Sequence, residues 1–305
     1  MSFLYPASKI LMLRPKRFGF NLLTADSNAF QNSLTDFNYS TIEDEFDDLI
    51  KKIHSQGIDV TVLEDSAEPP KPDAIFLNNW ISTHEDGGVF IYPMEAENRR
   101  IERRPELIEQ LYGSYIFSGF SDISSSEKKG QFLEGTGSLV IDHINRHVFA
   151  ALSSRTSQQL VESWAKQMNY EFTCFHAFDE SGKAIYHTNV LMSIGEEYMV
   201  VCMDSILNPL EQKMIKTYCK NNSKVLIDIS FQQMNSFAGN CIQLQNKQEQ
   251  KFIVISSTAY ASLKAEQIEL LTTNSDLIIG NIPTIEKIGG GSVRCMIAEN
   301  FLEKR

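Results

Sequence analysis

Apolar and polar positions along the chain predict short strands joined by longer helices. Two segments have the clearest hairpin pattern, in which two β-rich apolar runs flank a polar turn: residues 137–151 and 189–202. Other stretches have apolar residues three and four positions apart, the spacing of a helix with one buried face. These predicted helices are residues 41–56, 157–169, 208–221 and 261–272.

The strands and helices recur with a period of about fifty residues. Each repeat begins with a Gly- or Asn-bearing turn, a strand, a tight turn and a second strand, at residues 74–82, 134–152, 187–203, 239–258 and 289–299. In repeat architectures a single unit cannot bury its apolar face alone, so it packs against its neighbours. We therefore expect about five ββαβ units that close into a ring, with the first residues of each unit near its centre.

Composition limits the class of protein. The chain has 305 residues, of which 42% are hydrophobic and 22% are charged, as expected for a folded protein with a large core. The formal net charge is −11, and lysine and arginine do not alternate with aromatic residues in any run. We therefore expect neither nucleic acid nor an anionic membrane as a partner. No apolar run approaches the roughly 20 residues of a membrane span, and the apolar stretch 1–13 reads as a first strand.

The cysteines indicate a reducing compartment. They are five in number and form no Cys-x-x-Cys pair: positions 174, 202, 219, 241 and 295. Without an export signal, this odd number predicts free thiols and a cytoplasmic location. Cys202 and Cys241 lie in apolar strand runs and are interpreted as core residues. Cys295 differs, because three glycines and a serine at 289–292 permit a ligand to approach the backbone closely.

The starts of the repeats carry an unusual set of polar residues: Asn78, Asn79, Glu134, His187, Asn189, Asn240 and Cys295. A cysteine, a histidine and a carboxylate at matching positions supply a nucleophile, a proton shuttle and a group that orients or stabilises charge. We therefore predict that Cys295, His187 and Glu134 are catalytic. The alternative for Glu134 is a cap on the glycine loop that follows it.

The remaining histidines are interpreted as structural: His54, His84, His143, His147 and His176. His143 and His147 have a spacing that metal ligands can have, but they flank a turn between two strands. A tetrahedral zinc site would need further ligands, which the sequence does not offer nearby. We therefore expect no metal and no cofactor.

Six short motifs span nearly the whole chain: LRPKRFGFN at 13–21, FLNNW at 76–80, LEGTG at 133–137, SRTS at 154–157, YHTNV at 186–190 and GGGSVRC at 289–295. Together and in this order they resemble the guanidino-modifying enzymes of the pentein fold, which include arginine deiminases, dimethylarginine hydrolases and amidinotransferases. The similarity is greatest to the bacterial citrulline-utilisation hydrolases. The resemblance implies an α/β fold, a five-bladed propeller with pseudo-fivefold ββαβ repeats, and a single catalytic domain over residues 1–305.

The resemblance also implies roles for the candidate residues. The thiolate of Cys295 would attack the central carbon of the substrate group. His187 would protonate the leaving nitrogen and then activate the water that releases the covalent intermediate, a task that suits its near-neutral pKa. Glu134 would face the substrate nitrogens. The enzyme would thus be a hydrolase of C–N bonds outside peptides.

Two further features have two interpretations each. In the related families the segment around Arg155 supplies an arginine to the α-carboxylate of an amino-acid substrate; a solvated surface arginine is the alternative. Arg99 and Arg100 are weaker candidates for the same task. Residues 18–28 are either a lid over the pocket or a plain loop after the first strand.

The substrate prediction depends on Asn79 and Asn189. Arginine deiminases carry aspartates in the corresponding patterns, and a carboxylate suits a guanidinium cation, whereas a carboxamide is neutral and offers one donor group and one acceptor. A ureido group matches such an amide better. We therefore predict citrulline as the substrate, bound with the help of Asn78, and the resemblance implies ornithine, carbon dioxide and ammonia as products.

Other functions stay open. If the asparagines are only turn residues, which Asn favours, arginine or a methylated arginine becomes the substrate. An amidinotransferase would share Cys295 and His187 but pass the amidino group to an amine. A non-catalytic pentein would be a binding module, which is disfavoured because the three predicted catalytic residues are all present. The expected partner is a small amino-acid substrate, and homo-oligomerisation is not decided by the sequence.

Overall fold

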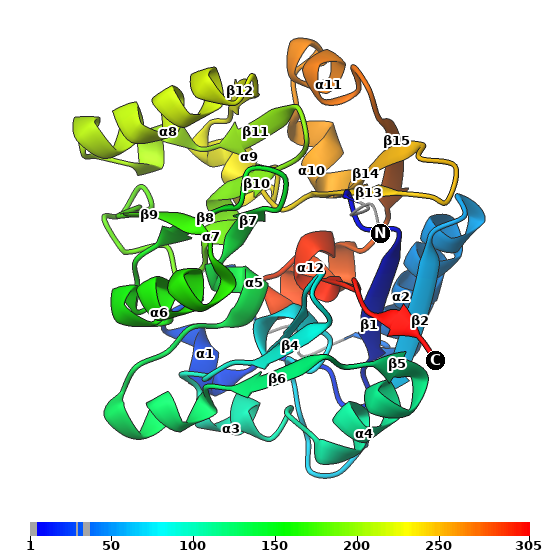
Figure 1. Cartoon of the computed structure of the whole chain (residues 1–305). Helices are drawn as coiled ribbons and strands as arrows, with labels where there is room; N and C mark the ends of the chain where they lie inside the picture. The colour runs from blue at the N-terminus through cyan, green and yellow to red at the C-terminus, as the bar shows by residue number, and fades with distance from the viewer. Residues whose placement is uncertain (1–4, 29, 33–36) are drawn as a thin grey trace.

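Five three-stranded sheets surround a common centre in the computed structural model, which describes residues 5–28, 30–32 and 37–305 (Figure 1). In each sheet the middle strand pairs antiparallel with one neighbour and parallel with the other. Four sheets use consecutive segments: β3 (Ile81–Thr83), β4 (Gly88–Ile91) and β6 (Gly119–Asp122); β7 (Val140–Asp142), β8 (His147–Ala151) and β9 (Glu171–Phe175); β10 (Met192–Ile194), β11 (Tyr198–Val201) and β12 (Val225–Asp228); β13 (Ile242–Gln245), β14 (Lys251–Ser256) and β15 (Asp276–Gly280).

The fifth sheet joins the two ends of the described chain. It contains β1 (Lys9–Arg14), β2 (Asp59–Glu64) and β16 (Ala298–Glu299), with Ile10 opposite Glu299. A short pair, β5 (Tyr115–Ile116) with β17 (Glu303–Lys304), adds a second link. The first strands of neighbouring sheets contact one another, as β16 does with β3 and β7 does with β10. The predicted ring of five ββαβ units is confirmed.

Helices cover the sheets and fill the connections. The predicted helices at 41–56, 157–169 and 208–221 are confirmed as α2 (Tyr39–Ser55), α6 (Gln158–Met168) and α8 (Pro209–Asn221). On α2 the residues Ile42, Phe46, Leu49 and Ile53 are fully buried, which is the apolar face that the sequence pattern predicts. Burial of each such side chain contributes about 1.5–3 kcal/mol.

The predicted helix at 261–272 is wrong in its extent. The chain forms α10 (Ser257–Ser262) and α11 (Ala265–Leu271), because Leu263 and Lys264 have extended backbone angles. The Gln267 side chain accepts a hydrogen bond from the backbone N–H of Lys264 and so starts the second helix. The other helical segments are α1 (Leu22–Ala25), η1 (Leu77–Asn79), α3 (Glu97–Arg100), α4 (Pro105–Ser114), η2 (Ser124–Lys129), α5 (Gly135–Ser138), α7 (Thr188–Leu191), η3 (Met203–Ser205), α9 (Phe231–Asn235), α12 (Pro283–Gly289) and η4 (Val293–Met296).

Single helical turns precede four of the inner strands. The turns η1, α5, α7 and η4 lie directly before β3, β7, β10 and β16. We expected the candidate residues at the starts of the strands, but they lie on these turns. Close packing of the turns explains one glycine: Gly135 has a φ of +48°, and a Cβ there would lie 2.1 Å from the carbonyl oxygen of Asn78. None of the helices in the described part of the chain has the length and apolar character of a membrane span.

Candidate active site

Four neighbouring repeats place the predicted catalytic residues around one small cavity. Its walls include Cys295 on η4, His187 at the start of α7 and Asn79 at the end of η1. Glu134, at the start of α5, is fully buried and contacts His187. The full set of lining residues is Asn28, Asp73, Phe76, Asn79, Arg99, Arg155, Tyr186, His187, Gly289, Gly290, Gly291 and Cys295.

His187 and Glu134 form a direct pair. The distance from His187 Nε2 to Glu134 Oε2 is 2.8 Å. Burial lowers the pKa of His187 to about 4, although Glu134 pulls it upward. Burial alone would raise the pKa of Glu134, but Arg155, His187 and Arg99 together hold it well below its usual range. At neutral pH the pair is therefore a neutral imidazole whose Nε2–H donates to a carboxylate, and the Nδ1 lone pair is free to act as a base.

The thiol of Cys295 receives hydrogen bonds from two carboxamides. Asn240 Nδ2 lies 3.2 Å from Cys295 Sγ, and Asn189 Nδ2 lies 3.5 Å from it. Burial raises the pKa of this thiol, while the amide donors and Arg294 act in the opposite direction. The resting Cys295 side chain is therefore a thiol, and amide donors are already in place for its ionised form.

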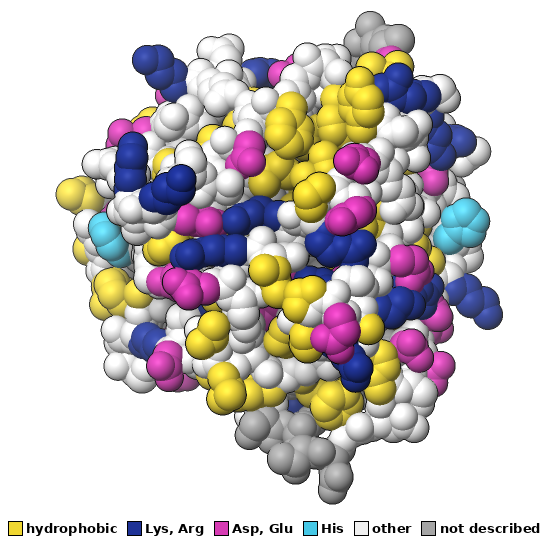
Figure 2. Space-filling model, turned by 90° about the horizontal axis from the view of Figure 1, so that it is seen from below, with side chains coloured by type: hydrophobic (Ala, Val, Ile, Leu, Met, Phe, Trp, Pro, Cys, Tyr) yellow, Lys and Arg dark blue, Asp and Glu magenta, His cyan; other side chains and the backbone are white. Residues whose placement is uncertain are grey.

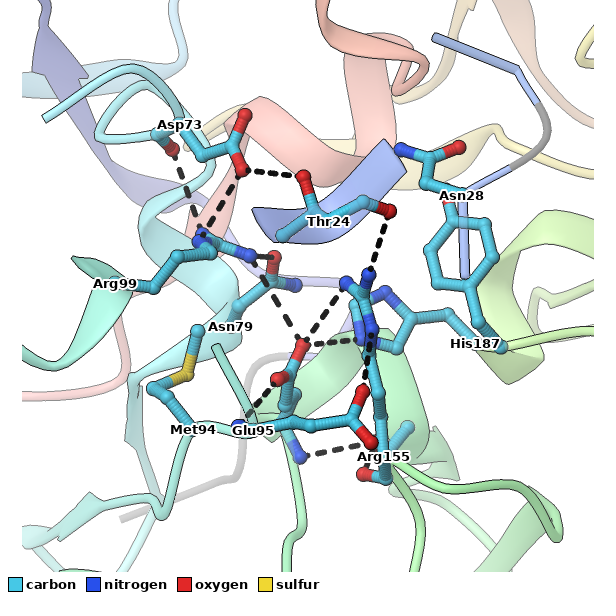
Figure 3. Close-up of polar contacts among 12 residues, drawn as sticks. Thr24, Asn28, Asp73, Asn79, Met94, Glu95, Arg99, Arg155 and His187 are labelled. Atoms are coloured by element: carbon cyan, nitrogen blue, oxygen red, sulfur yellow. Dashed lines mark hydrogen bonds and ion pairs between the residues drawn. The ribbon is translucent and has the colours of Figure 1, made fainter. Parts of the chain in front are cut away.

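Arg99 connects three buried groups beside the cavity. Its guanidinium makes two bonds of 2.9 Å to the carboxylate of Glu102. Its NH1 donates to Asn79 Oδ1 at 2.8 Å, a contact that Figure 3 shows. Because Arg99 is only a donor, the Asn79 oxygen must face it and the Asn79 NH₂ must face away. That NH₂ donates to Asn78 Oδ1 at 3.0 Å. Burial raises the pKa of Glu102 to about 7, even against the charge of Arg99.

Arg155 is almost completely buried, so the alternative of a solvated surface arginine is wrong. Its guanidinium lies over the Tyr186 ring at 4.8 Å, 3.4 Å from Glu95 Oε2 and 3.5 Å from Glu134 Oε2. It also donates to Ser27 Oγ and to the carbonyl oxygen of Thr24. Figure 3 shows Arg155, Arg99 and His187 converging on one point from separate parts of the chain.

The other two predicted asparagines differ in position. Asn78 does not line the cavity, because its side chain is engaged by Thr136 on one side and by Asn79 on the other. Asn189 is buried beside Cys295, and its Oδ1 has no hydrogen-bond partner among the described residues. A buried acceptor without a partner costs about 1–3 kcal/mol, so this oxygen is a candidate contact for a substrate N–H.

The segment 18–28 covers the cavity, which favours the lid over the plain loop. Asn21 Nδ2 donates to Asp73 Oδ2 at 2.7 Å, and Thr24 Oγ1 reaches the same oxygen at 3.3 Å. Asn28 Nδ2 donates to the carbonyl oxygen of Gly289 at 3.2 Å. Leu22 and Leu23 on the outer face of α1 are exposed.

Three residues of this site received no predicted role: Asp73, Tyr186 and Asn240. Asp73 lies three residues before the FLNNW motif and Tyr186 begins the YHTNV motif, but neither side chain is distinctive alone. Asn240 follows Gly239 at the position in the fourth repeat that matches Asn79 and Asn189, so the repeat itself was the usable signal.

The interpretation of His143 and His147 agrees with their contacts. His147 Nε2 lies 2.8 Å from Thr173 Oγ1, and His143 Nδ1 lies 3.3 Å from the Tyr170 hydroxyl. Across the described residues, no group of three or more His, Cys, Asp and Glu side chains has an arrangement that could hold a metal ion.

Comparison with solved structures finds the same fold in enzymes of arginine metabolism. ArgZ, an arginine dihydrolase from the ornithine-ammonia cycle in cyanobacteria, superposes with a TM-score of 0.75 at 14% identity, over 95% of this chain and 40% of that one. The substrate-bound N-terminal domain of ArgZ, as a cysteine-to-serine variant, gives 0.74 at 15% identity, over 95% and 96% of the two chains. A dimethylarginine dimethylaminohydrolase adduct gives 0.67 at 16% identity, over 96% and 100%.

These identities are low, so the superpositions show the fold alone. The chain spans about 40% of the length of full-length ArgZ. Comparison with curated protein sequences finds no significant match.

The five-sheet ring and the site at its centre define a pentein of the guanidino-modifying superfamily. A family model described as N,N dimethylarginine dimethylhydrolase, eukaryotic, matches residues 14–302. The chain therefore belongs to the dimethylarginine dimethylhydrolase family. This membership confirms the predicted class of enzyme, a cysteine-dependent hydrolase of C–N bonds outside peptides.

Proposed function

We propose that the chain hydrolyses the guanidino group of a free amino acid of the arginine type, with Cys295 as the nucleophile. The observation that carries the proposal is the cavity whose wall includes both Cys295 and His187, with the buried Glu134 hydrogen-bonded to His187. Family membership supports a guanidino substrate over citrulline, the ureido substrate that the sequence led us to predict.

The charges around the cavity also support a cationic substrate. Four carboxyl groups and two guanidinium groups are linked by contacts of 4 Å or less: Asp73, Glu95, Glu102, Glu134, Arg99 and Arg155. Four acids against two bases leave a formal charge of −2, or −1 when Glu102 is protonated. An arginine side chain brings the compensating positive charge that citrulline lacks.

In the first half of the reaction, Cys295 Sγ attacks the central guanidino carbon. The proton of the Cys295 thiol passes to the neutral imidazole of His187 as the C–S bond forms. The C–N bond to the leaving nitrogen then breaks, and His187 delivers that proton to the nitrogen, which departs as ammonia or an amine. Glu134 stabilises the imidazolium that exists between these proton transfers, since it already accepts from Nε2 at 2.8 Å.

In the second half, water replaces the leaving group. His187 takes a proton from the water, the oxygen attacks the carbon bound to sulfur, and the C–S bond breaks with return of the electron pair to Cys295. Arginine would give citrulline and ammonia, and a methylated arginine would give citrulline and a methylamine. Arg155, whose Nε has an ion pair with Glu95 at 3.4 Å but no hydrogen bond among the described residues, is proposed to bind the α-carboxylate.

Citrulline hydrolysis is a second candidate because of how Asn79 and Asn189 are oriented. Arg99 occupies the oxygen of Asn79, so this side chain offers N–H, whereas Asn189 offers an oxygen without a partner. A ureido group has one carbonyl and one NH₂, and it could use both. If arginine is the substrate, Asn79 and Asn189 would instead bind the citrulline formed by the first hydrolysis. A second hydrolysis would then give ornithine.

The test is release of ammonia, methylamine, citrulline and ornithine from arginine, asymmetric dimethylarginine and citrulline. Wild type is compared with Cys295→Ala and with Cys174→Ala, a control at a partly exposed cysteine outside the site. We expect turnover of a guanidino substrate that disappears in Cys295→Ala and persists in Cys174→Ala. Turnover of citrulline alone would reject the guanidino proposal in favour of the second candidate. Failure on all three substrates would reject both.

Several expectations stay proposals. Figure 2 shows one face of the molecule, on which Lys and Arg side chains are interleaved with Asp and Glu, so this face presents charges of both signs. We keep a small amino acid as the expected partner, without nucleic acid or membrane. A single domain over 1–305, a cytoplasmic location and the oligomeric state stay predictions for solution measurements.

A further inference from the structure

Asn240 contacts the sulfur of Cys295 but does not line the cavity proposed to receive the substrate. It is 1% exposed. We infer that Asn240 is a positioning residue that holds Cys295 and stabilises its thiolate through a fixed side-chain amide. The inference rests on Cys295 as the proposed nucleophile, but it requires no particular substrate.

Three hydrogen bonds fix the orientation of the Asn240 amide. Its Nδ2 donates to Cys295 Sγ at 3.2 Å and to the carbonyl oxygen of Asn189 at 2.8 Å, while its Oδ1 accepts from the backbone N–H of Arg294 at 3.1 Å. A flipped amide would point its oxygen at the Asn189 carbonyl and its NH₂ at the Arg294 N–H, which is two repulsive contacts. The NH₂ therefore faces the sulfur permanently.

The backbone around Asn240 is built for this contact. A Cβ on Gly239 would lie 2.7 Å from the carbonyl oxygen of Val190, so only glycine lets the fourth repeat approach α7 this closely. Phe237 has a φ of +63°, and the backbone N–H of Asn240 closes the turn onto its carbonyl oxygen at 2.8 Å. A left-handed conformation at a phenylalanine is uncommon and is retained where the surrounding structure requires it.

In the described part of the chain no cationic side chain donates a hydrogen bond to the Cys295 sulfur, although the charge of Arg294 lowers the thiol pKa from a distance. Among the described residues the side chains that donate to Cys295 Sγ are Asn240 and Asn189, and neither lysine nor arginine does so. The guanidinium of Arg294, the next residue, is turned away: it donates to the carbonyl oxygen of Ile297 at 2.8 Å and pairs with Glu299 at 3.2 Å. Hydrogen bonds to the charged form favour ionisation, so the two amides replace the positive charge that often activates a cysteine.

Asn240 is the stronger donor of the two amides. Its distance to the sulfur is shorter than that of Asn189, and its orientation is fixed on three sides. Asn189 Oδ1, by contrast, has no hydrogen-bond partner among the described residues, so the orientation of the Asn189 amide is not fixed on that side. Of the two asparagines, Asn240 is thus the one that is fixed in place as a donor to Cys295. Asn189 also donates to Cys295, but its oxygen has no hydrogen-bond partner among the described residues.

The test is the pH dependence of Cys295 alkylation by iodoacetamide, followed by mass spectrometry of the peptide that contains Cys295. Wild type is compared with Asn240→Leu, which keeps the shape but removes the donor, and Asn240→Asp, which replaces the donor by a carboxylate. The matched control is Ser193→Ala, a buried residue whose hydroxyl contacts Cys241 instead. Circular dichroism and thermal melting establish that each variant is folded.

We expect the apparent pKa of Cys295 to rise by about one unit in Asn240→Leu, which means a tenfold loss of thiolate at pH values below both pKa values. In Asn240→Asp the apparent pKa should rise further. Ser193→Ala should keep the wild-type profile. In turnover, Asn240→Leu should lower kcat about tenfold near neutral pH with little change in KM, and higher pH should restore it. A folded Asn240→Leu with the wild-type alkylation profile would overturn the inference.

A measurement on the unmodified side chain covers variants that fail to fold. The Asn240 Nδ2 proton resonances of the wild type should shift with the apparent pKa of Cys295, because the hydrogen bond strengthens as the sulfur ionises, and should not titrate in Cys295→Ser. Absence of any shift in the wild type would also reject the inference. Alkylation and NMR use no substrate, so failure of the proposed function leaves both results interpretable.

Discussion

Gly137 lies where the backbone of α5 meets two functional side chains. A Cβ at this position would be 2.6 Å from Asn79 Nδ2, 2.8 Å from His187 Nδ1 and 2.9 Å from His187 Cε1. Ordinary contact begins at 3.4 Å, so Gly137→Ala must move these atoms by roughly 0.5–0.8 Å. Neither side chain can move freely, because His187 is bonded to Glu134 and Asn79 to Arg99.

Such a displacement should change the stability of the fold only modestly but should lower the catalytic rate strongly. Overpacking of this kind costs about 1–3 kcal/mol of stability. A misplacement approaching 1 Å in a catalytic group can cost about a hundredfold in rate, so we expect kcat to fall roughly 10- to 100-fold. Steady-state kinetics on the substrate identified above, together with urea unfolding, measures both effects.

Gly113→Ala is the matched control. Gly113 lies in α4, where an added Cβ meets nothing within 4 Å. Alanine should therefore leave kcat unchanged and raise stability by about 0.5–1 kcal/mol, since it is the better helix former. Equal activity in the two variants would refute the argument that the Gly137 backbone sets the positions of His187 and Asn79.

Three further changes test separate parts of the site and core. Glu134→Gln removes the carboxylate beside His187 and should lower kcat by roughly 10²–10⁴, measured as product release; a fall below fivefold would contradict the role of the pair. Arg155→Lys loses the planar fork and should raise KM about 10- to 100-fold; a change in kcat alone would argue against carboxylate binding. Burial lowers the pKa of His84 to about 3 from 6.5, so its protonation favours unfolding and stability is lost as the pH falls below 6.5. Between pH 7.5 and 5 the wild type should lose about 2 kcal/mol more than His84→Asn in urea unfolding, and equal losses would contradict the assigned burial effect.

The sequence by itself determined the repeat and the family, and it was enough to propose the catalytic residues. Apolar periodicity located the strands and most helices because those elements bury one face, and this local pattern is written in consecutive residues. Cys295, His187 and Glu134 could be proposed because short motifs mark their positions in the repeat: GGGSVRC, YHTNV and LEGTG. The split of 261–272 into α10 and α11 was not predicted, because the break lies at Leu263 and Lys264, where no Gly or Pro marks the end of a helix.

Tertiary structure alone decided which polar atoms face the substrate. Asn78 and Asn79 are neighbours of the same type, yet only Asn79 lines the cavity, because Thr136 from the next repeat engages Asn78. Arg155 was equally consistent with a surface position until its contacts with Glu134 and Tyr186 were known. Hydrogen bonds between distant repeats orient each amide and bury each charge, and no pattern within one segment encodes such pairings.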